Sequence, residues 1–182
     1  IAGQLDEVTV LARAYNLRGH ITRLLGQSAT AIQDFQQAFD LYQRAGDIHG
    51  QAISHNQIAN ACFDIGQWQQ ADHHYRHARE AFNLLEDVYN RALAENNLGG
   101  IALNQGRLDE AAKFYQEALR SLEQIGSLWA VGALYNNLGD VWIRRGDIAA
   151  ARTCLRKSQD YFEQAQVRDF LPELHRHLSE AA

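Results

Sequence analysis

The sequence predicts an all-α fold built from antiparallel helix pairs that repeat every 40 residues. The chain is rich in Ala, Leu and Gln and has a single proline, Pro172, so few residues interrupt a helix. Six positions recur in phase over four copies, which is typical of a helical repeat protein. The six columns are Gly26, Gly66, Gly106 and Gly146; Ala31, Ala71, Ala111 and Ala151; Asn16, Asn56, Asn96 and Asn136; Gly19, Ala59, Gly99 and Gly139; Phe35, Tyr75, Tyr115 and Leu155; and Ala38, Ala78, Ala118 and Ser158.

Each repeat is predicted to hold two helices, here called the A helix and the B helix. Glycine such as Gly106 ends the A helix, because glycine adopts the left-handed cap conformation without a steric penalty. Gly46 and Gly126 end two B helices in the same way, and the next residues are candidate N-caps. The candidate N-caps are Asp47, Asp87 and Ser127. The predicted A helices span 8–25, 48–65, 88–105 and 128–145, and the B helices span 28–45, 68–85, 108–125 and 148–165.

The ends of the chain predict a single repeat array, 1–182, that belongs to a longer protein. The four repeats cover about 8–47, 48–87, 88–127 and 128–168, and a fifth begins at 169–182. Its helix starts near Asp169, with Pro172 in the first turn, where a missing N–H does no harm. Residues 1–4 align with the end of an earlier B helix. The chain begins at Ile1 and has no methionine, so we expect it to be a piece of a larger protein.

Some repeated positions always hold a small side chain and another mostly holds a large one, and this pattern predicts close packing inside each hairpin. A small residue such as Gly99 or Ala111 lets two helix backbones approach, and the ring of Tyr115 fills the remaining space. We therefore expect Ala71 and Ala111 to be buried at close helix contacts.

These residues identify a resemblance to the tetratricopeptide repeat. The run Asn96-Asn97-Leu98-Gly99, followed by Gly106 and Ala111, resembles its motif, and the run from Asn136 to Gly139 matches it again. The 40-residue period is similar to the longer repeats of kinesin light chains, Pins-type polarity adaptors, bacterial signal-transduction ATPases and MalT-like regulators. The resemblance covers nearly the whole chain. It implies a right-handed superhelical solenoid that binds a protein or peptide on its concave face. In the first repeat, Arg18 stands where the motif has leucine, and Ser28 replaces a large apolar residue.

The A helices line the concave face in this family, so the candidate peptide-binding residues lie on them. Asparagine is a mediocre helix former, yet one occurs in all four copies, and an amide can bond a peptide backbone without selecting its sequence. The alternative is that these amides bond neighbouring helices and hold the stack together. The predicted site consists of Asn16, Asn56, Asn96 and Asn136, with Asn97, Asn137 and Gln57 as a partial second row and Ile53 and Leu93 as apolar neighbours.

Two other functions remain open beside a peptide-binding adaptor. One is the sensor arm of a signal-transduction ATPase or transcriptional regulator, and the other is self-association through the ends of the array. An enzyme is not expected, because the chain has no glycine-rich phosphate loop and no nucleophile elbow. No cofactor is predicted for the same reason.

Composition and spacing exclude several kinds of partner and site. The formal charge of −5 and the pI of about 5.9 predict no binding to nucleic acid or to an anionic membrane. No run of 18 apolar residues is present, so no membrane-spanning helix is expected. Cys62 and Cys154 fall at packing positions, which favours a cytoplasmic protein without disulfides. His73 and His77 share one helix face, but zinc sites need about four ligands, so no metal site is predicted.

Overall fold

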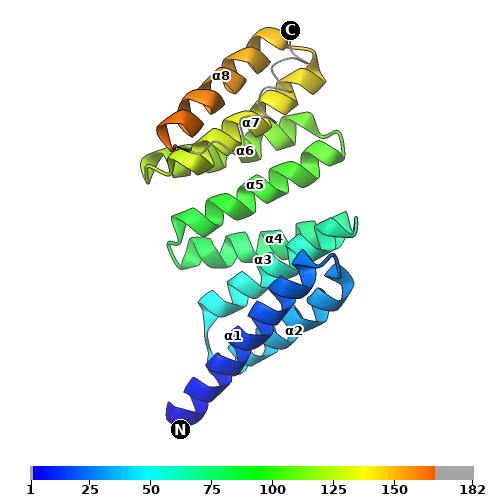
Figure 1. The fold of residues 1–182 in the computed structure, drawn as a ribbon, viewed down its shortest axis with the longest axis vertical. Helices are drawn as coiled ribbons and strands as arrows, with labels where there is room; N and C mark the ends of the chain where they lie inside the picture. Colours follow the sequence, from blue (N-terminus) through cyan, green and yellow to red (C-terminus); the bar gives the residue numbers. More distant parts are fainter. Residues whose placement is uncertain (1, 167–182) are drawn as a thin grey trace. The chain divides into compact units, whose positions relative to one another are not determined.

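The computed structural model describes residues 2–166, with side chains from residue 7 onward. Eight helices and no strand occur in this part of the chain, which confirms the all-α prediction. Figure 1 shows them in chain order, from α1 in blue to α8 in orange. The predicted helix from Asp169 lies outside the described residues. The helices are α1 (Ala2–Leu24), α2 (Ser28–Ala45), α3 (Ile48–Asp64), α4 (Trp68–Leu84), α5 (Val88–Asn104), α6 (Leu108–Gln124), α7 (Leu128–Arg145) and α8 (Ile148–Gln164).

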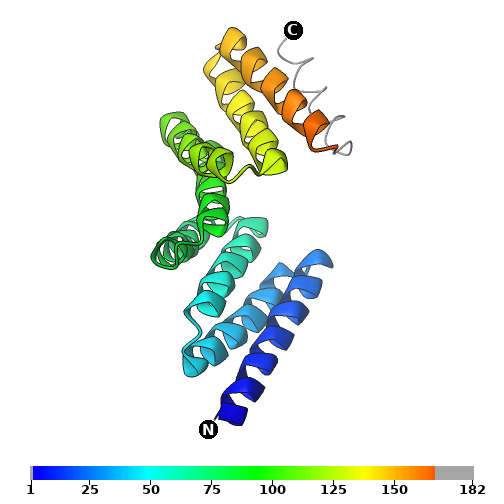
Figure 2. The ribbon, with the colours of Figure 1, turned by 90° about the vertical axis from the view of Figure 1, so that its left-hand side faces the viewer.

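The chain forms two compact units, one of residues Ile1–Ala94 and one of residues Glu95–Ala182. The border falls inside α5. In the first unit α1 packs against α2, α2 against α3, and α3 against α4. In the second unit α6 packs against α7 and α7 against α8 (Figure 2). The A helices are thus α1, α3, α5 and α7, and the B helices are α2, α4, α6 and α8.

Left-handed residues separate the helices, as the glycine columns predict. The four glycines between A and B helices, for example Gly106 with φ of 73°, all have positive φ. Gly46 and Gly126 do the same between B and A helices, each with φ of 71°. Two other residues at this turn are not glycine, and they still adopt φ near +56°: Glu86 at 56° and Gln166 at 57°. The left-handed conformation therefore occurs at this turn even where a Cβ atom makes it unfavourable.

Replacing Glu86 with glycine is expected to stabilise the protein by about 0.5–1 kcal/mol, because the left-handed penalty exceeds the entropy that glycine adds to the unfolded chain. Urea denaturation followed by circular dichroism measures the change. Glu80→Gly is the matched control, since Glu80 is an exposed residue of α4. There glycine should cost about 1 kcal/mol, because it weakens a helix interior. Equal destabilisation by both variants would contradict this account of the turn.

Aspartate caps three of the helices. The Asp47 carboxylate accepts from Gly50 N at 2.8 Å, and the Asp87 carboxylate accepts from Asn90 N at 3.0 Å, as predicted. Asp147 caps α8 in the same way, a role the sequence analysis missed. The prediction for Ser127 is wrong in one respect. Ser127 occupies the N-cap position of α7, but its side chain makes no capping hydrogen bond.

The start of the chain also differs from its prediction. Residues 2–4 are not the tail of an earlier helix, because α1 runs without a break from Ala2 to Leu24. The position that matches the left-handed turns at Gly46 and Glu86 is Asp6, and the chain remains helical there. No backbone turn therefore separates residues 2–4 from the rest of α1.

The hairpin cores pair a small residue with a large one. A Cβ atom on Gly99 would lie 2.5 Å from the Tyr115 ring, and one on Gly139 would lie 2.6 Å from Leu155. Ala71 and Ala111 are fully buried, as expected. The close-packing columns of the sequence are thus the columns of the core.

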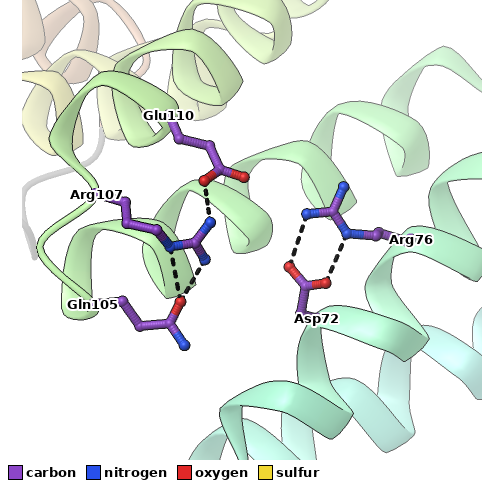
Figure 3. A network of polar contacts seen from close by, with 5 residues as sticks. All are labelled: Asp72, Arg76, Gln105, Arg107 and Glu110. Carbon is purple, nitrogen blue, oxygen red and sulfur yellow. Dashed lines mark hydrogen bonds and ion pairs between the residues drawn. The ribbon is translucent and has the colours of Figure 1, made fainter.

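Exposed polar side chains form ion pairs and hydrogen bonds within single helices and around turns. Arg76 and Asp72 form an ion pair along α4, with Nε and Oδ2 2.7 Å apart (Figure 3). Separately, Arg107 contacts Glu110 and Gln105 around the turn between α5 and α6. Such exposed pairs contribute little to stability. No helix among the described residues is long and apolar enough to cross a membrane.

Candidate functional site

The asparagine column lies on the four A helices, one residue in each. Asn16 is on α1, Asn56 on α3, Asn96 on α5 and Asn136 on α7, and all four side chains are half-buried. The position is the same in each hairpin, because α1, α3, α5 and α7 share one register. The hydrogen bonds of these amides nevertheless differ between the two units.

In the second unit the amides bond to one another. Asn137 Nδ2 donates to Asn96 Oδ1 at 2.8 Å, which joins α7 to α5. Asn96 Nδ2 in turn donates to the Oδ1 of Asn97 at 3.3 Å. Arg144 Nη1 reinforces the same pair of helices by donating to the Leu103 carbonyl at 3.4 Å. These amides therefore brace neighbouring A helices.

In the first unit the amides have no such partner. The Oδ1 atoms of Asn16 and Asn56 are buried, and neither accepts a hydrogen bond from any described residue. Gln57 is used locally, since its Oε1 accepts from Asn60 Nδ2 at 3.2 Å. Asn60 also accepts from the Tyr75 hydroxyl at 2.6 Å. A buried acceptor without a donor costs free energy, so Asn16 and Asn56 are the unsatisfied members of the column.

The apolar members of the predicted site are half-buried. Ile53 packs against the cluster of Ala52, Ala78 and Phe82 in the first unit, so part of its surface belongs to the core. Leu93 is half-buried on α5. Each residue therefore offers only part of its side chain to a partner.

An open pocket of about 530 Å³ lies between α1 and α2. Arg18 lines it and forms a bidentate ion pair with Asp34, with Nη2 to Oδ1 at 2.5 Å and Nε to Oδ2 at 3.0 Å. Asp34 is buried, so this ion pair explains why Arg18 replaces the leucine of the motif. The sequence carried a signal for it. Arg18 and Asp34 lie in the same repeat, and each differs from the residues at the equivalent positions of other repeats. The residues that match Asp34 in the next two repeats are His74 and Phe114.

Four histidines gather between α3 and α4, and sequence reasoning found only those on α4. His55 Nδ1 lies 2.8 Å from His74 Nδ1, and the His55 ring stacks on His77 with centroids 5.3 Å apart. His73 contacts His77 edge-on with centroids 4.4 Å apart, and the centroid of the Phe39 ring of α2 lies 4.7 Å from that of His55. His73 and His77 are exposed, while His55 and His74 are half-buried. Among the described residues, no group of three or more His, Cys, Asp or Glu residues is arranged to hold a metal ion.

Burial lowers the pKa of His55 to about 4, and repulsion from His74, His77 and His73 acts in the same direction. The pKa of His74 is also lowered, first by burial and then by His73 and His77. Both groups bind protons more readily in the unfolded chain. Their contribution to stability is therefore complete above pH 6.5, and it is lost as the pH falls from 6.5 toward 4.

Acidification from pH 7 to pH 5 is expected to destabilise the wild-type chain more than the His55→Gln variant, by about 1–2 kcal/mol after discounting for the half-exposed ring. Thermal melts at both pH values measure the difference. His49→Gln is the control, because His49 lies outside the cluster and contacts Asp87 instead. A variant with the same acid sensitivity as wild type would show that the cluster does not govern it.

The chain matches a protein family and several proteins of known structure. The family described as tetratricopeptide repeat matches residues 10–83 and 90–164. BtubC (BKLC) from P. vanneervenii is 20% identical with a TM-score of 0.79, and the match covers 88% of this chain and 66% of that chain. Aspartyl phosphate phosphatase F from Bacillus subtilis is 17% identical with a TM-score of 0.89, covering 94% of this chain and 45% of that one. A putative kinesin light chain with nearly identical TPR-like repeats from Podosopora anserina is 15% identical with a TM-score of 0.75, covering 96% and 86%.

These likenesses show the fold. The chain spans 66% of BtubC and 45% of the phosphatase, so it matches only part of each. No curated protein sequence matches the chain.

Proposed function

Because the chain belongs to the tetratricopeptide repeat family, we propose that it binds an extended segment of a partner protein along its A helices. The observation that carries this proposal is the contrast within the asparagine column. Asn16 and Asn56 have buried amide oxygens without donors, whereas Asn96 and Asn137 bond to each other. An unsatisfied amide loses no internal hydrogen bond when it turns toward a ligand.

The asparagines of the two units then have different roles, ligand binding in the first unit and support of neighbouring helices in the second. Asn16 and Asn56 of the first unit hydrogen-bond the backbone of the bound segment, and Ile53 and Leu93 contact its apolar side chains. In the second unit Asn96, Asn97 and Asn137 hold α5 and α7 in place. Backbone contacts by neutral amides give affinity with little dependence on sequence or on salt.

Asn56→Ala and Asn96→Ala are expected to have opposite effects. Asn56→Ala should leave the melting temperature unchanged or higher, because it removes an unsatisfied acceptor and alanine is the better helix former. It should weaken peptide binding by about 0.5–1.5 kcal/mol, which is roughly 2–13-fold. Asn96→Ala should cost about 1–3 kcal/mol of stability, because it removes the acceptor of the Asn137 amide and with it the hydrogen bond between α5 and α7, and the folded variant should still bind.

The probe is a synthetic 12-residue peptide selected from a random display library against the wild-type chain. Calorimetric titration at low and high salt measures binding, and thermal melts measure stability. A low melting temperature for Asn56→Ala combined with normal binding would make Asn56 structural and refute the proposal.

A further inference from the structure

Helices α3 and α4 bring four imidazole rings together in a closed circuit, in which each ring contacts two others. The centroid distances are 5.1 Å for His55–His74, 5.4 Å for His74–His73, 4.4 Å for His73–His77 and 5.3 Å for His77–His55. All four residues belong to the first unit, in which α3 packs against α4. We call them the histidine cluster.

The repeat fold does not require histidine at any of these positions. In the first, third and fourth repeats, none of the residues that match the histidine cluster is histidine. At the positions of His73 and His77, for example, the first repeat has Gln33 and Gln37. Packing of the hairpin therefore does not explain why this repeat alone gathers four imidazoles.

The spacing of the cluster is close to that of a tetrahedral zinc site. With Zn–N bonds of about 2.0–2.1 Å, two ligating nitrogens lie about 3.3 Å apart and the centroids of their rings about 5 Å apart. The Nδ1 atoms of His55 and His74 are 2.8 Å apart, so one carries the proton that the other accepts. A zinc ion takes the place of that proton, which leaves to solvent, once the two nitrogens separate by about 0.5 Å.

His73 and His77 are placed to supply the other two ligands. They lie four residues apart on α4, the spacing at which two histidines of one helix bind a single zinc ion. Their rings must rotate to do so, because no three of these side chains surround a metal position as the structure stands. Both residues are exposed, and exposed side chains change rotamer within nanoseconds.

The chemistry of the cluster favours zinc over magnesium or calcium. Imidazole is a good ligand for zinc, whereas magnesium and calcium prefer oxygen. The nearby carboxylate of Asp72 already pairs with Arg76, with Oδ2 and Nε 2.7 Å apart. Burial lowers the pKa of His55 and of His74, so both rings are neutral at pH 7, as metal binding requires.

We propose that the histidine cluster binds one Zn²⁺ ion through its four imidazoles and that the ion joins α3 to α4. The sequence shows two of these ligands on one helix face, and the fold adds His55 and His74. Four protein ligands leave no open coordination position, so the ion stabilises the hairpin and catalyses no reaction. The site does not depend on peptide binding by the asparagine column.

Calorimetric titration of ZnCl₂ into the metal-free full chain at pH 7 tests the proposal, with MgCl₂ as the control salt. One Zn²⁺ ion should bind per chain with a Kd of about 1 μM or below, and Mg²⁺ should not bind. Saturating zinc should also raise the melting temperature, because the folded state alone assembles the four ligands.

Two variants separate the four-ligand site from a pair of surface histidines. His73→Gln combined with His77→Gln removes the exposed ligands, and the first repeat folds with glutamine at both positions. His55→Gln removes a ligand on α3. Each variant should weaken zinc binding at least about 10-fold and lose the rise in melting temperature. His49→Gln is the matched control, because His49 lies outside the cluster and contacts Asp87, and it should bind zinc as wild type does.

Three results would overturn the proposal. The first is no saturable binding at about 100 μM ZnCl₂. The second is wild-type affinity in His55→Gln, which would reduce the site to the two histidines on the surface of α4. The third is an equal loss in His49→Gln, which would show that zinc binds histidines of the surface without selecting the cluster.

Discussion

Phe35→Ala is expected to destabilise the protein by about 3–5 kcal/mol, the largest effect of any substitution considered. Phe35 is fully buried, and its ring lies so close to α1 that a Cβ atom on Gly19 would be 2.7 Å from it. Truncation leaves a cavity that the rigid helix pair closes only partly. Guanidinium denaturation measures the loss.

Phe35→Leu tests whether this loss comes from volume. Leu155 occupies the same column in the fourth repeat and fits against Gly139. Leucine at position 35 should therefore cost about 1–1.5 kcal/mol, well below the cost of alanine. If alanine and leucine destabilise equally, the assigned packing of α1 against α2 is wrong.

Gly99→Ala is expected to cost about 1–3 kcal/mol, while Gly100→Ala is expected to stabilise the protein by up to about 1 kcal/mol. A methyl group at Gly99 would lie 2.5 Å from the Tyr115 ring, which must move. A methyl group at Gly100 would meet only the Tyr115 hydroxyl, at an ordinary 3.8 Å, and alanine is the better helix former.

The two glycines are adjacent in α5, so each variant is the other's control for helix propensity. Thermal melts under identical conditions measure the pair. Stabilisation by both substitutions would show that the helices do not approach each other at Gly99.

The sequence predicts the eight helices well because each boundary has a local cause. The predicted ends of α3 to α6 lie one residue from the observed ends, since glycine or a left-handed residue stops each helix. Where the local signal is absent, prediction fails. Positions 6 and 86 both match the turn glycines Gly46 and Gly126, and neither is glycine. The chain stays helical at Asp6, whereas Glu86 adopts the left-handed conformation of the turn. The local sequence therefore does not decide between a turn and a continued helix at this position.

The candidate site was also only partly predictable from the sequence. The 40-residue period is enough to find the asparagine column and to place it on the A helices. It does not reveal that Asn96 bonds to Asn137 while Asn56 has an unsatisfied oxygen, because these contacts depend on distances between helices. The pair of His55 and His74 escaped sequence reasoning for that reason, since 19 positions separate the two residues.

Side-chain amide resonances of the chain labelled with ¹⁵N-asparagine test the central claim most directly. The selected 12-residue peptide is titrated into the wild-type chain, and single Asn→Ala variants assign each resonance. The proposal predicts that the NH₂ signals of Asn16 and Asn56 shift on binding, while those of Asn96 and Asn137 keep their positions and their mutual hydrogen bond. Shifts confined to Asn96 and Asn137, with Asn16 and Asn56 unchanged, would contradict it.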